Sequence, residues 1–178
     1  MNVNFKSILF IGISSIFMAA CSTKSMEEVS PETVSGRWQV QMINSTEETT
    51  SFPKETYSEN VADQDLYLEF NADGTYTTNS DIELGEITKG NGAVSTGNYK
   101  FSNSRLELTY DDAGLGVPIT IYFNTEINGS MLNLSLTKKE LINAFADNTG
   151  LDAFSQTFIQ VFLEDVVTFD FNLSLMKQ

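Results

Sequence analysis

The 178-residue sequence contains no histidine, one cysteine, three prolines and one tryptophan. The lack of histidine excludes Ser-His-Asp and Cys-His catalysis as well as imidazole metal sites. The single cysteine, Cys21, cannot form a disulfide within the chain. Basic residues are also scarce, because 10 Lys and Arg face 24 Asp and Glu, for a net charge of −14. Nucleic acids and anionic lipid surfaces are therefore poor partners, and what remains is carboxylate chemistry or no chemistry.

The N-terminus lacks an apolar run long enough to span a bilayer, which takes about 20 residues. Instead, residues 1–6 carry one lysine and no acid, and a short apolar stretch follows over Ser7–Ala20. This arrangement predicts a secretory signal over residues 1–20. The residues Met18-Ala19-Ala20-Cys21 resemble the bacterial lipobox, whose cysteine is lipidated on sulfur and, after cleavage, acylated on its new amine. The resemblance implies that Cys21 anchors the chain in a membrane through acyl chains such as palmitate, at about 0.8 kcal/mol per buried CH₂.

The alternative is a simple secretory signal, cleaved after Ala20, which would leave Cys21 as a free thiol. Such a thiol is a liability in an oxidising compartment, so we favour lipidation. Residues 21–33 are polar and predict a flexible tether of about 20 Å. Ser22 favours the outer membrane, and Lys24–Glu28 faintly resembles the surface-export signals of Bacteroidetes lipoproteins, although we favour a solvated tether. The expected location is the cell envelope, on the periplasmic face of the outer membrane or on the cell surface.

From Val34 onward, apolar and polar residues alternate with a period of two, which is typical of half-buried β-strands. The alternation is clearest in the segments GRWQVQMI, DLYLEF, RLELTY, ITIYFNTEI and MLNLSL. In the first of these segments it places Trp38, Val40 and Met42 on one face. Asn128-Gly129 is the preferred dipeptide of a tight hairpin turn. The pattern predicts about seven antiparallel strands, joined mainly by hairpins, before residue 137.

The period changes at Thr137, where Thr137-Lys-Lys-Glu140 predicts a capping box and the start of a helix. The next segment, LDAFSQTFIQVF, has apolar residues at spacings of three and four, and such a stripe usually packs against the core. A last alternating segment follows, with its inner face beginning at Val167. A meander of this length removes its edges by closing into a barrel. The predicted fold is mainly β: an antiparallel β-barrel of about eight strands with two short helices before the last strand. The helical stripe consists of Leu151, Phe154, Phe158, Val161 and Phe162.

Gly36-Arg37-Trp38, near the start of the first strand, resembles the lipocalin G-x-W motif, in which the Trp seals the closed end of the barrel. The phrases LEFNADGTYT and GNYKFSNSRLELTY resemble lipocalin-like lipoproteins of Bacteroidetes, which also carry a helical segment before the last strand. The resemblance implies a lipocalin-like barrel domain over residues 34–178 that binds a small apolar ligand without catalysis. Lipocalins usually stack a late Arg on that Trp, and no Arg follows Arg105 here.

A barrel of eight strands encloses either packed side chains or one small ligand. The predicted ligand-binding residues are inward-facing or helical: Trp38, Phe70, Tyr99, Phe101, Tyr110, Phe123, Leu134 and Phe158. The alternative is that these side chains fill a solid core, in which case the chain is a structural or interaction module with a protein partner in the envelope. The two helices form either a lid over the barrel mouth or a plug or permanent cap. We favour the plug or permanent cap, because amphipathic stripes usually pack against the core. Ala113–Pro118 is either a mobile rim or an ordinary connection.

Hydrolysis by paired carboxylates needs two acids that face one cavity. The alternation places the strand acids opposite the apolar faces, and only Asp112 continues an inward row. Calcium prefers carboxylate oxygens, but neither residues 63–65 nor residues 111–112 carry a full ligand set. We therefore expect a protein that is not an enzyme and has no metal and no cofactor. The acids on the outward faces are Glu69, Glu107, Glu126 and Asp170.

Overall fold

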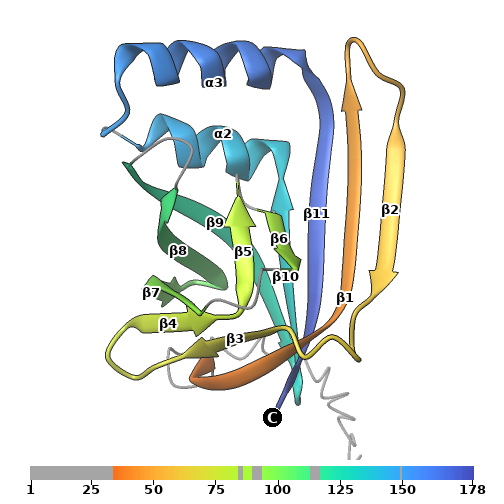
Figure 1. The fold of residues 1–178 in the computed structure, drawn as a ribbon, viewed down its shortest axis with the longest axis vertical. Helices are drawn as coiled ribbons and strands as arrows, with labels where there is room; N and C mark the ends of the chain where they lie inside the picture. Colours follow the sequence, from red (N-terminus) through yellow and green to blue (C-terminus); the bar gives the residue numbers. More distant parts are fainter. Residues whose placement is uncertain (1–33, 84–85, 90–93, 113–116, 149) are drawn as a thin grey trace, which may run out of the picture.

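The computed structural model describes residues 34–83, 86–89, 94–112, 117–148 and 150–178. This part of the chain forms a β-barrel with two helices at one end (Figure 1). The elements follow in the order β1 (Gly36–Thr49), β2 (Glu55–Asn60), β3 (Tyr67–Phe70), β4 (Thr75–Thr78), β5 (Ser80–Glu83), β6 (Glu86–Lys89), β7 (Ser95–Ser102), β8 (Arg105–Asp112), β9 (Val117–Asn128), β10 (Met131–Thr137), α2 (Lys138–Ala146), α3 (Ala153–Asp165) and β11 (Val166–Lys177).

Eight antiparallel strands form the barrel, in the order β1, β3, β4, β7, β8, β9, β10 and β11. The last strand returns to the first and closes the ring, with Trp38 opposite Lys177 at one end and Thr49 opposite Val166 at the other. Closure leaves no free edge between the first and last barrel strands. The predicted fold class, a closed barrel of eight strands with two short helices before the last strand, is confirmed.

Two features of the barrel wall were not predicted. β3 pairs only with residues 36–39 of β1, and β2 takes over as the neighbour of β1 from Met42 to Glu47. β5 and β6 form a separate two-stranded sheet. The β2 sequence, ETYSEN, has no alternating apolar residue, and its side chains are almost all exposed, so a search for periodicity passes over it.

The first strand also departs from the predicted alternation. A β-bulge between Val40 and Met42 inserts one residue, so that Val40 and Ile43 both face the core. Met42, predicted to face inward, instead lies on the outer face opposite Ser174. The bulge bends β1 at the level where its neighbour changes from β3 to β2.

The barrel interior is filled by apolar side chains from every barrel strand. Burying each large apolar side chain contributes about 1.5–3 kcal/mol, so this set supplies the main stabilisation. The largest fully buried side chains are Trp38, Leu68, Phe70, Tyr76, Ile87, Leu106, Leu108, Ile119, Ile121, Phe123, Leu132 and Leu134.

Helix α2 closes the upper end of the barrel and is held at both of its ends. At its start, the Glu140 carboxylate accepts hydrogen bonds from the Thr137 hydroxyl and, at 3.2 Å, from the Thr137 backbone N–H, as the capping-box prediction requires. At its end, the Tyr122 hydroxyl donates to Asp147 over 2.9 Å. Three α2 side chains are buried, which fits a permanent cap better than a lid: Leu141, Ala144 and Phe145.

Helix α3 differs from the prediction. Leu151, just before it, is buried, but Phe154 and Val161 of the predicted stripe are 80% and 61% exposed, and Phe162 is also exposed. The side chains that face the barrel are instead Ile159, which is buried, and Leu163, which is partly buried. The helix has apolar residues on two sides, and only the side with Ile159 packs against the core.

The closing strand begins at Val166 as predicted, but the first position of its predicted inner face is wrong. Val166 is buried at the junction of α3 and β11, whereas Val167, predicted to face inward, is exposed. The rest of the predicted inner face, Phe169 to Leu175, is buried as the alternation requires.

Several predictions concern residues outside the described part of the chain. Residues 1–33, with Cys21 and the tether, and Ala113–Gly116 of the glycine-rich loop lie there. The side chains of Asp112 and Phe158 also lie outside the described set. Neither α2 nor α3, nor any other helix within the described ranges, is long and apolar enough to cross a membrane.

Gly97 offers a sharp test of the packing between β4, β7 and β8. A Cβ at this position would lie 2.3 Å from the Thr109 carbonyl oxygen and 2.6 Å from the ring of Tyr76. We expect Gly97→Ala to lower the free energy of unfolding by about 1–3 kcal/mol, measured by urea denaturation. Gly150→Ala is the matched control, because nothing lies within 4 Å of its Cβ position, and a change of similar size there would contradict the explanation.

The capping box predicts a pH-dependent contribution from Glu140. Partial burial opposes ionisation, but hydrogen bonds from Thr137, Asn124 and backbone N–H groups outweigh it, so the pKa of Glu140 lies below its ordinary value. The contribution is therefore present above the ordinary Glu pKa and is lost as the pH falls through the lowered one. We expect Glu140→Gln to cost about 0.5–1 kcal/mol at pH 7, and the difference from wild type to shrink below about pH 4. Glu126→Gln, on the exposed outer wall, is the control for loss of a carboxylate at pH 7, where we expect little change in stability.

Candidate functional site

The closed end of the barrel is built around Trp38. Its indole N–H donates to the carbonyl oxygen of Val34 over 2.6 Å, and the side chain is completely buried. Gly36, two residues earlier, has a φ of +109°, which only glycine adopts without strain. The glycine and the tryptophan thus have separate tasks: one allows the chain to enter the barrel at this angle, and the other fills the base.

A cation does face this tryptophan, although it is a lysine. The Nζ of Lys177, at the end of β11, lies 5.2 Å from the centroid of the Trp38 ring. The pairing of Trp38 with Lys177 in the β1–β11 ladder places the two side chains together. The resemblance to lipocalins pointed to an arginine, so this lysine was not predicted. Any cation near the end of the last strand would have indicated the contact.

At the same end of the barrel, where Phe70 lies opposite Gly36, aromatic rings pack against one another. The rings of Phe70 and Tyr99 meet edge to face with centroids 4.9 Å apart, and Phe70 also lies 6.5 Å from Tyr76. The Tyr99 hydroxyl donates to the carbonyl oxygen of Asn71, which fixes its ring. Such pairs add about 0.5–1.5 kcal/mol beyond burial, so this end of the barrel is firmly packed.

Seven of the eight predicted ligand-binding residues have side chains that the structure describes, and all seven are buried inside the barrel. Phe70 and Tyr99 contact each other. Leu106, Leu108 and Ile119 on β8 and β9 lie opposite Phe123, Ile121 and Tyr110, respectively, within the same apolar wall. That a ligand contacts these residues stays a prediction. The seven residues are Trp38, Phe70, Tyr99, Phe101, Tyr110, Phe123 and Leu134.

One side of the upper barrel keeps contact with solvent, and we call it the open side. It is the inner face of β1, β2 and β11 and is formed by Ile43, Ser45, Tyr57 and Phe169. Tyr57 is 50% exposed, and it shares this inner face with the buried apolar side chains of Ile43 and Phe169. Ser45 faces Tyr57 on β2 and Phe171 on β11. The sequence did not indicate this side, because Tyr57 lies in the polar segment that was not predicted to be a strand.

The open side also carries negative charge. Glu47 lies directly opposite Glu55, and Glu59 lies opposite Ile43, on the same inner face. The Tyr57 hydroxyl donates to Glu59, and this hydrogen bond raises the pKa of Tyr57. No group of three or more Asp, Glu, Cys or His side chains among the described residues is arranged to hold a metal ion. The open side is therefore an apolar surface with carboxylates at its rim.

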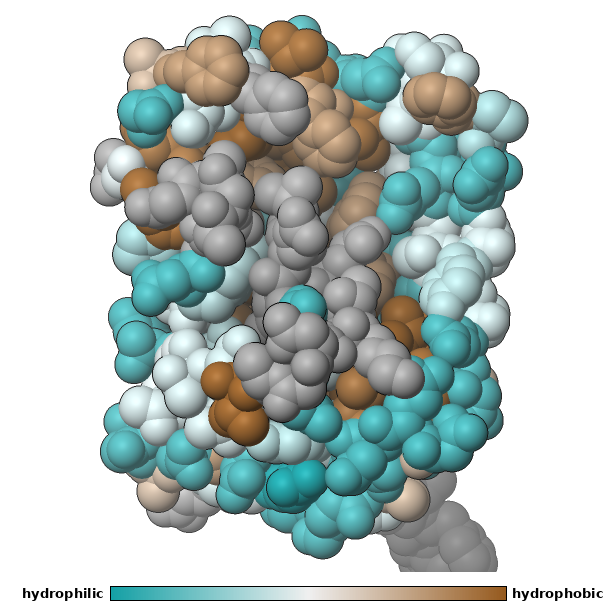
Figure 2. Space-filling view, in the orientation of Figure 1, coloured by the Kyte–Doolittle hydropathy of each residue, from teal (hydrophilic) through white to brown (hydrophobic). Residues whose placement is uncertain are grey.

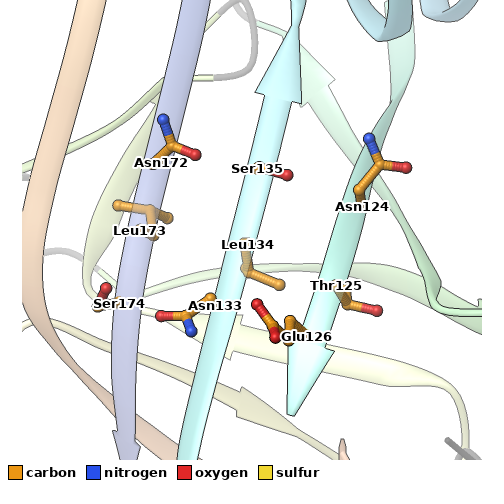
Figure 3. Close-up of a pocket in the computed structure, with 9 residues that line it drawn as sticks. All are labelled: Asn124, Thr125, Glu126, Asn133, Leu134, Ser135, Asn172, Leu173 and Ser174. Atoms are coloured by element: carbon orange, nitrogen blue, oxygen red, sulfur yellow. The ribbon is translucent and has the colours of Figure 1, made fainter. Parts of the chain in front are cut away.

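A depression of about 360 Å³ lies on the outside of the barrel across β9, β10 and β11 (Figure 3). Amide and hydroxyl groups of outward-facing residues surround a single carboxylate, that of Glu126. Its described lining therefore does not contain the two acids that hydrolysis by paired carboxylates needs. Only Leu134 is shared with the predicted ligand set, and its side chain is buried on the other side of the wall. The lining residues are Asn124, Thr125, Glu126, Asn133, Leu134, Ser135, Asn172, Leu173 and Ser174.

Comparison with known families gives one match. Residues 34–142, more than half of the chain, match the family model described as a lipocalin-like domain. The match runs from the residue that accepts the Trp38 hydrogen bond into helix α2 and so includes every barrel strand except β11. Neither the curated proteins nor the solved structures contain a match to this chain.

The contact between Lys177 and Trp38 leads to a specific expectation. Removing the cation in Lys177→Ala should lower the free energy of unfolding by about 0.5–1 kcal/mol, the usual size of an exposed cation–π contact. Lys177→Arg should retain stability, because a guanidinium group stacks well on an indole ring. Since Trp38 is the single tryptophan, its fluorescence reports unfolding directly. Equal stability of the Ala and Arg variants would show that the contact contributes nothing.

Proposed function

Because this chain belongs to the lipocalin-like domain family, we propose that its barrel binds a small, mainly apolar ligand without catalysing a reaction. The observation that carries this proposal is the open side, where the half-exposed Tyr57 lies on the inner face of the barrel beside the apolar side chains of Ile43 and Phe169. A concave apolar surface with a few polar groups is the usual form of a small-molecule site. The ligand would lie against Ile43, Tyr57 and Phe169, beneath helix α2.

The sheet topology supports a lateral route to this site. Within the described part of the chain, Trp38 fills the base and the buried side chains of α2 cover the upper end, so an entrance at either end is disfavoured. Between them, β3 and β4 are only four residues long, and the wall above them consists of β2 and the β5–β6 hairpin (Figure 1). β2 and the hairpin belong to different sheets and share no strand pairing. We infer that the ligand enters between them.

The charges at the open side limit the chemistry of the ligand. Glu47, Glu55 and Glu59 share the inner face with Tyr57, and the chain as a whole has a net charge of −14. A ligand with an anionic head group, such as a fatty acid, would meet like charges there. A neutral or cationic amphiphile would instead place its tail on Phe169 and its head group near the carboxylates.

We further propose that the protein is anchored through acylated Cys21. Val34, the first described residue, lies at the closed end of the barrel, where its carbonyl oxygen binds Trp38. A tether over residues 21–33 would therefore hold the closed base toward the membrane. The open side and the helices would then face away from the membrane, accessible to a ligand in the envelope.

Two tryptophan substitutions on adjacent residues of β1 test the binding site. In Ser45→Trp the new side chain faces inward, between Tyr57 and Phe171, and fills the open side. In Asn44→Trp it faces outward on the same strand and serves as the control. We expect Ser45→Trp to weaken the binding of a long-chain alcohol at least tenfold, measured by calorimetry, whereas Asn44→Trp leaves it unchanged.

The same titration distinguishes the head groups. Dodecanol and dodecylamine should bind more tightly than dodecanoate at pH 7, because only the last carries a charge that the rim carboxylates repel. Equal binding of all three compounds to wild type and to Ser45→Trp would exclude the open side as the site. Unfolding midpoints of both variants, measured in parallel, separate loss of binding from loss of fold.

A further inference from the structure

Exposed apolar side chains gather at the helical end of the barrel. Three of them lie on α3, namely Phe154, Val161 and Phe162, and we call them the α3 patch. Figure 2 shows hydrophobic side chains over this end of the molecule, in contrast to the mostly hydrophilic lower half. Large apolar patches of this kind on an otherwise polar surface mark interaction sites more often than they occur by chance.

The α3 patch is not a consequence of a loosely formed helix. The Asp152 side chain caps α3 by accepting from the Ser155 N–H over 2.7 Å, and Ile159 secures the opposite face to the core. The hydrogen bonds of Asp152 lower its pKa, so the cap is ionised near neutral pH. The helix is therefore fixed in an orientation that presents Phe154 and Val161 to solvent.

The apolar surface continues beyond the helix. The loop after β1 is tied to the end of α3, because the Thr50 N–H donates to the Asp165 carbonyl oxygen over 2.8 Å and the Thr50 hydroxyl donates to the Asp165 carboxylate. This loop carries Phe52, which is exposed, and Val167 after α3 is exposed as well. Near the C-terminal end of α3, exposed apolar side chains thus come from a second element as well, the loop after β1.

The charges around the patch select its occupant. Acids lie at both ends of α3, Asp152 at its start and Glu164 and Asp165 in its last turn, and residues 153–165 contain no basic residue. Lys138 of α2 donates to the carbonyl oxygen of Val166, and the exposed Lys54 lies in the loop that carries Phe52. Pairing of α3 with a second copy, in either orientation, would bring acid against acid, and an anionic lipid surface would be repelled in the same way.

We propose that the α3 patch docks another protein through an apolar segment flanked by Lys or Arg residues. The apolar residues of the partner cover Phe154, Val161 and Phe162, and its basic residues face Asp152 at one end and Glu164 at the other. This arrangement is an apolar centre with a charged rim of complementary sign, which gives specificity as well as affinity. The surface is separate from the open side and does not depend on a ligand in the barrel.

Photo-crosslinking of the full chain in its own cells tests the proposal. Phe154→benzoylphenylalanine places the crosslinker in the centre of the patch, and Met176→benzoylphenylalanine is the control at an exposed apolar position near the opposite end. We expect at least fivefold more crosslinked product from position 154. Mass spectrometry should identify the crosslinked peptide as an apolar segment of another protein with Lys or Arg on both sides.

Additional substitutions in the crosslinking variant test the role of the charges and the independence from a ligand in the barrel. Adding Glu164→Lys should lower the yield at least threefold, whereas adding Glu126→Lys on the outer wall, or Ser45→Trp at the open side, should leave it unchanged. The proposal is overturned if the crosslinks join position 154 to a second copy, to lipid or to residues 1–33 of the same chain. A yield no higher than that of the Met176 control, or a partner segment without flanking basic residues, overturns it as well.

Discussion

The pairing of β1 with β11 is the interaction on which the rest of the structure depends. It joins the first and last strands over nearly their whole length and converts a meander with two free edges into a closed barrel. The same ladder places Lys177 over Trp38 at the base and Phe171 beside Ser45 at the open side. Because these contacts join distant parts of the chain, they carry a high cost in loop closure and form only when both ends of the domain are present.

Much of the fold could be predicted because burial imposes a period on the sequence. Strands that face the core on one side must alternate, and β10 and the described side chains of β8 do so without interruption. The capping box at Thr137 and Glu140 could also be predicted, because a helix start favours Ser or Thr at the N-cap and Glu or Gln three residues later. The inward position of seven of the predicted ligand-binding residues follows from the same alternation.

The features that were missed have other physical causes. A one-residue bulge after Val40 reverses the face of Met42, and nothing local in the sequence announces it. β2 is held by backbone pairing to β1 rather than by burial, so its polar side chains carry no periodic signal, and Tyr57 was overlooked with them. In α3 the spacing correctly indicated an apolar stripe, but tertiary packing selected the side with Ile159 and left Phe154 outside.

The four regions of the barrel therefore differ in what their surfaces can do. The base is packed: the Trp38 indole N–H is hydrogen-bonded to the carbonyl oxygen of Val34, and the Phe70 and Tyr99 rings are in contact. The outer wall over β9, β10 and β11 is polar and suited to water. The open side and the α3 patch both present apolar or aromatic groups to solvent. We propose a small molecule for the first, because its residues lie on the inner face of the barrel, and a protein for the second, because it is an exposed helix face.

Native mass spectrometry of the chain from Ser22 to Gln178, purified from a bacterial host, shows whether the barrel holds a ligand. We expect a single apolar molecule bound to each chain, or one taken up on incubation with neutral or cationic amphiphiles, and its release on denaturation identifies its class. A mass equal to that of the protein alone, unchanged after incubation with amphiphiles, haem and envelope lipids, would contradict this expectation. In that case the barrel would be a solid support for the helical end.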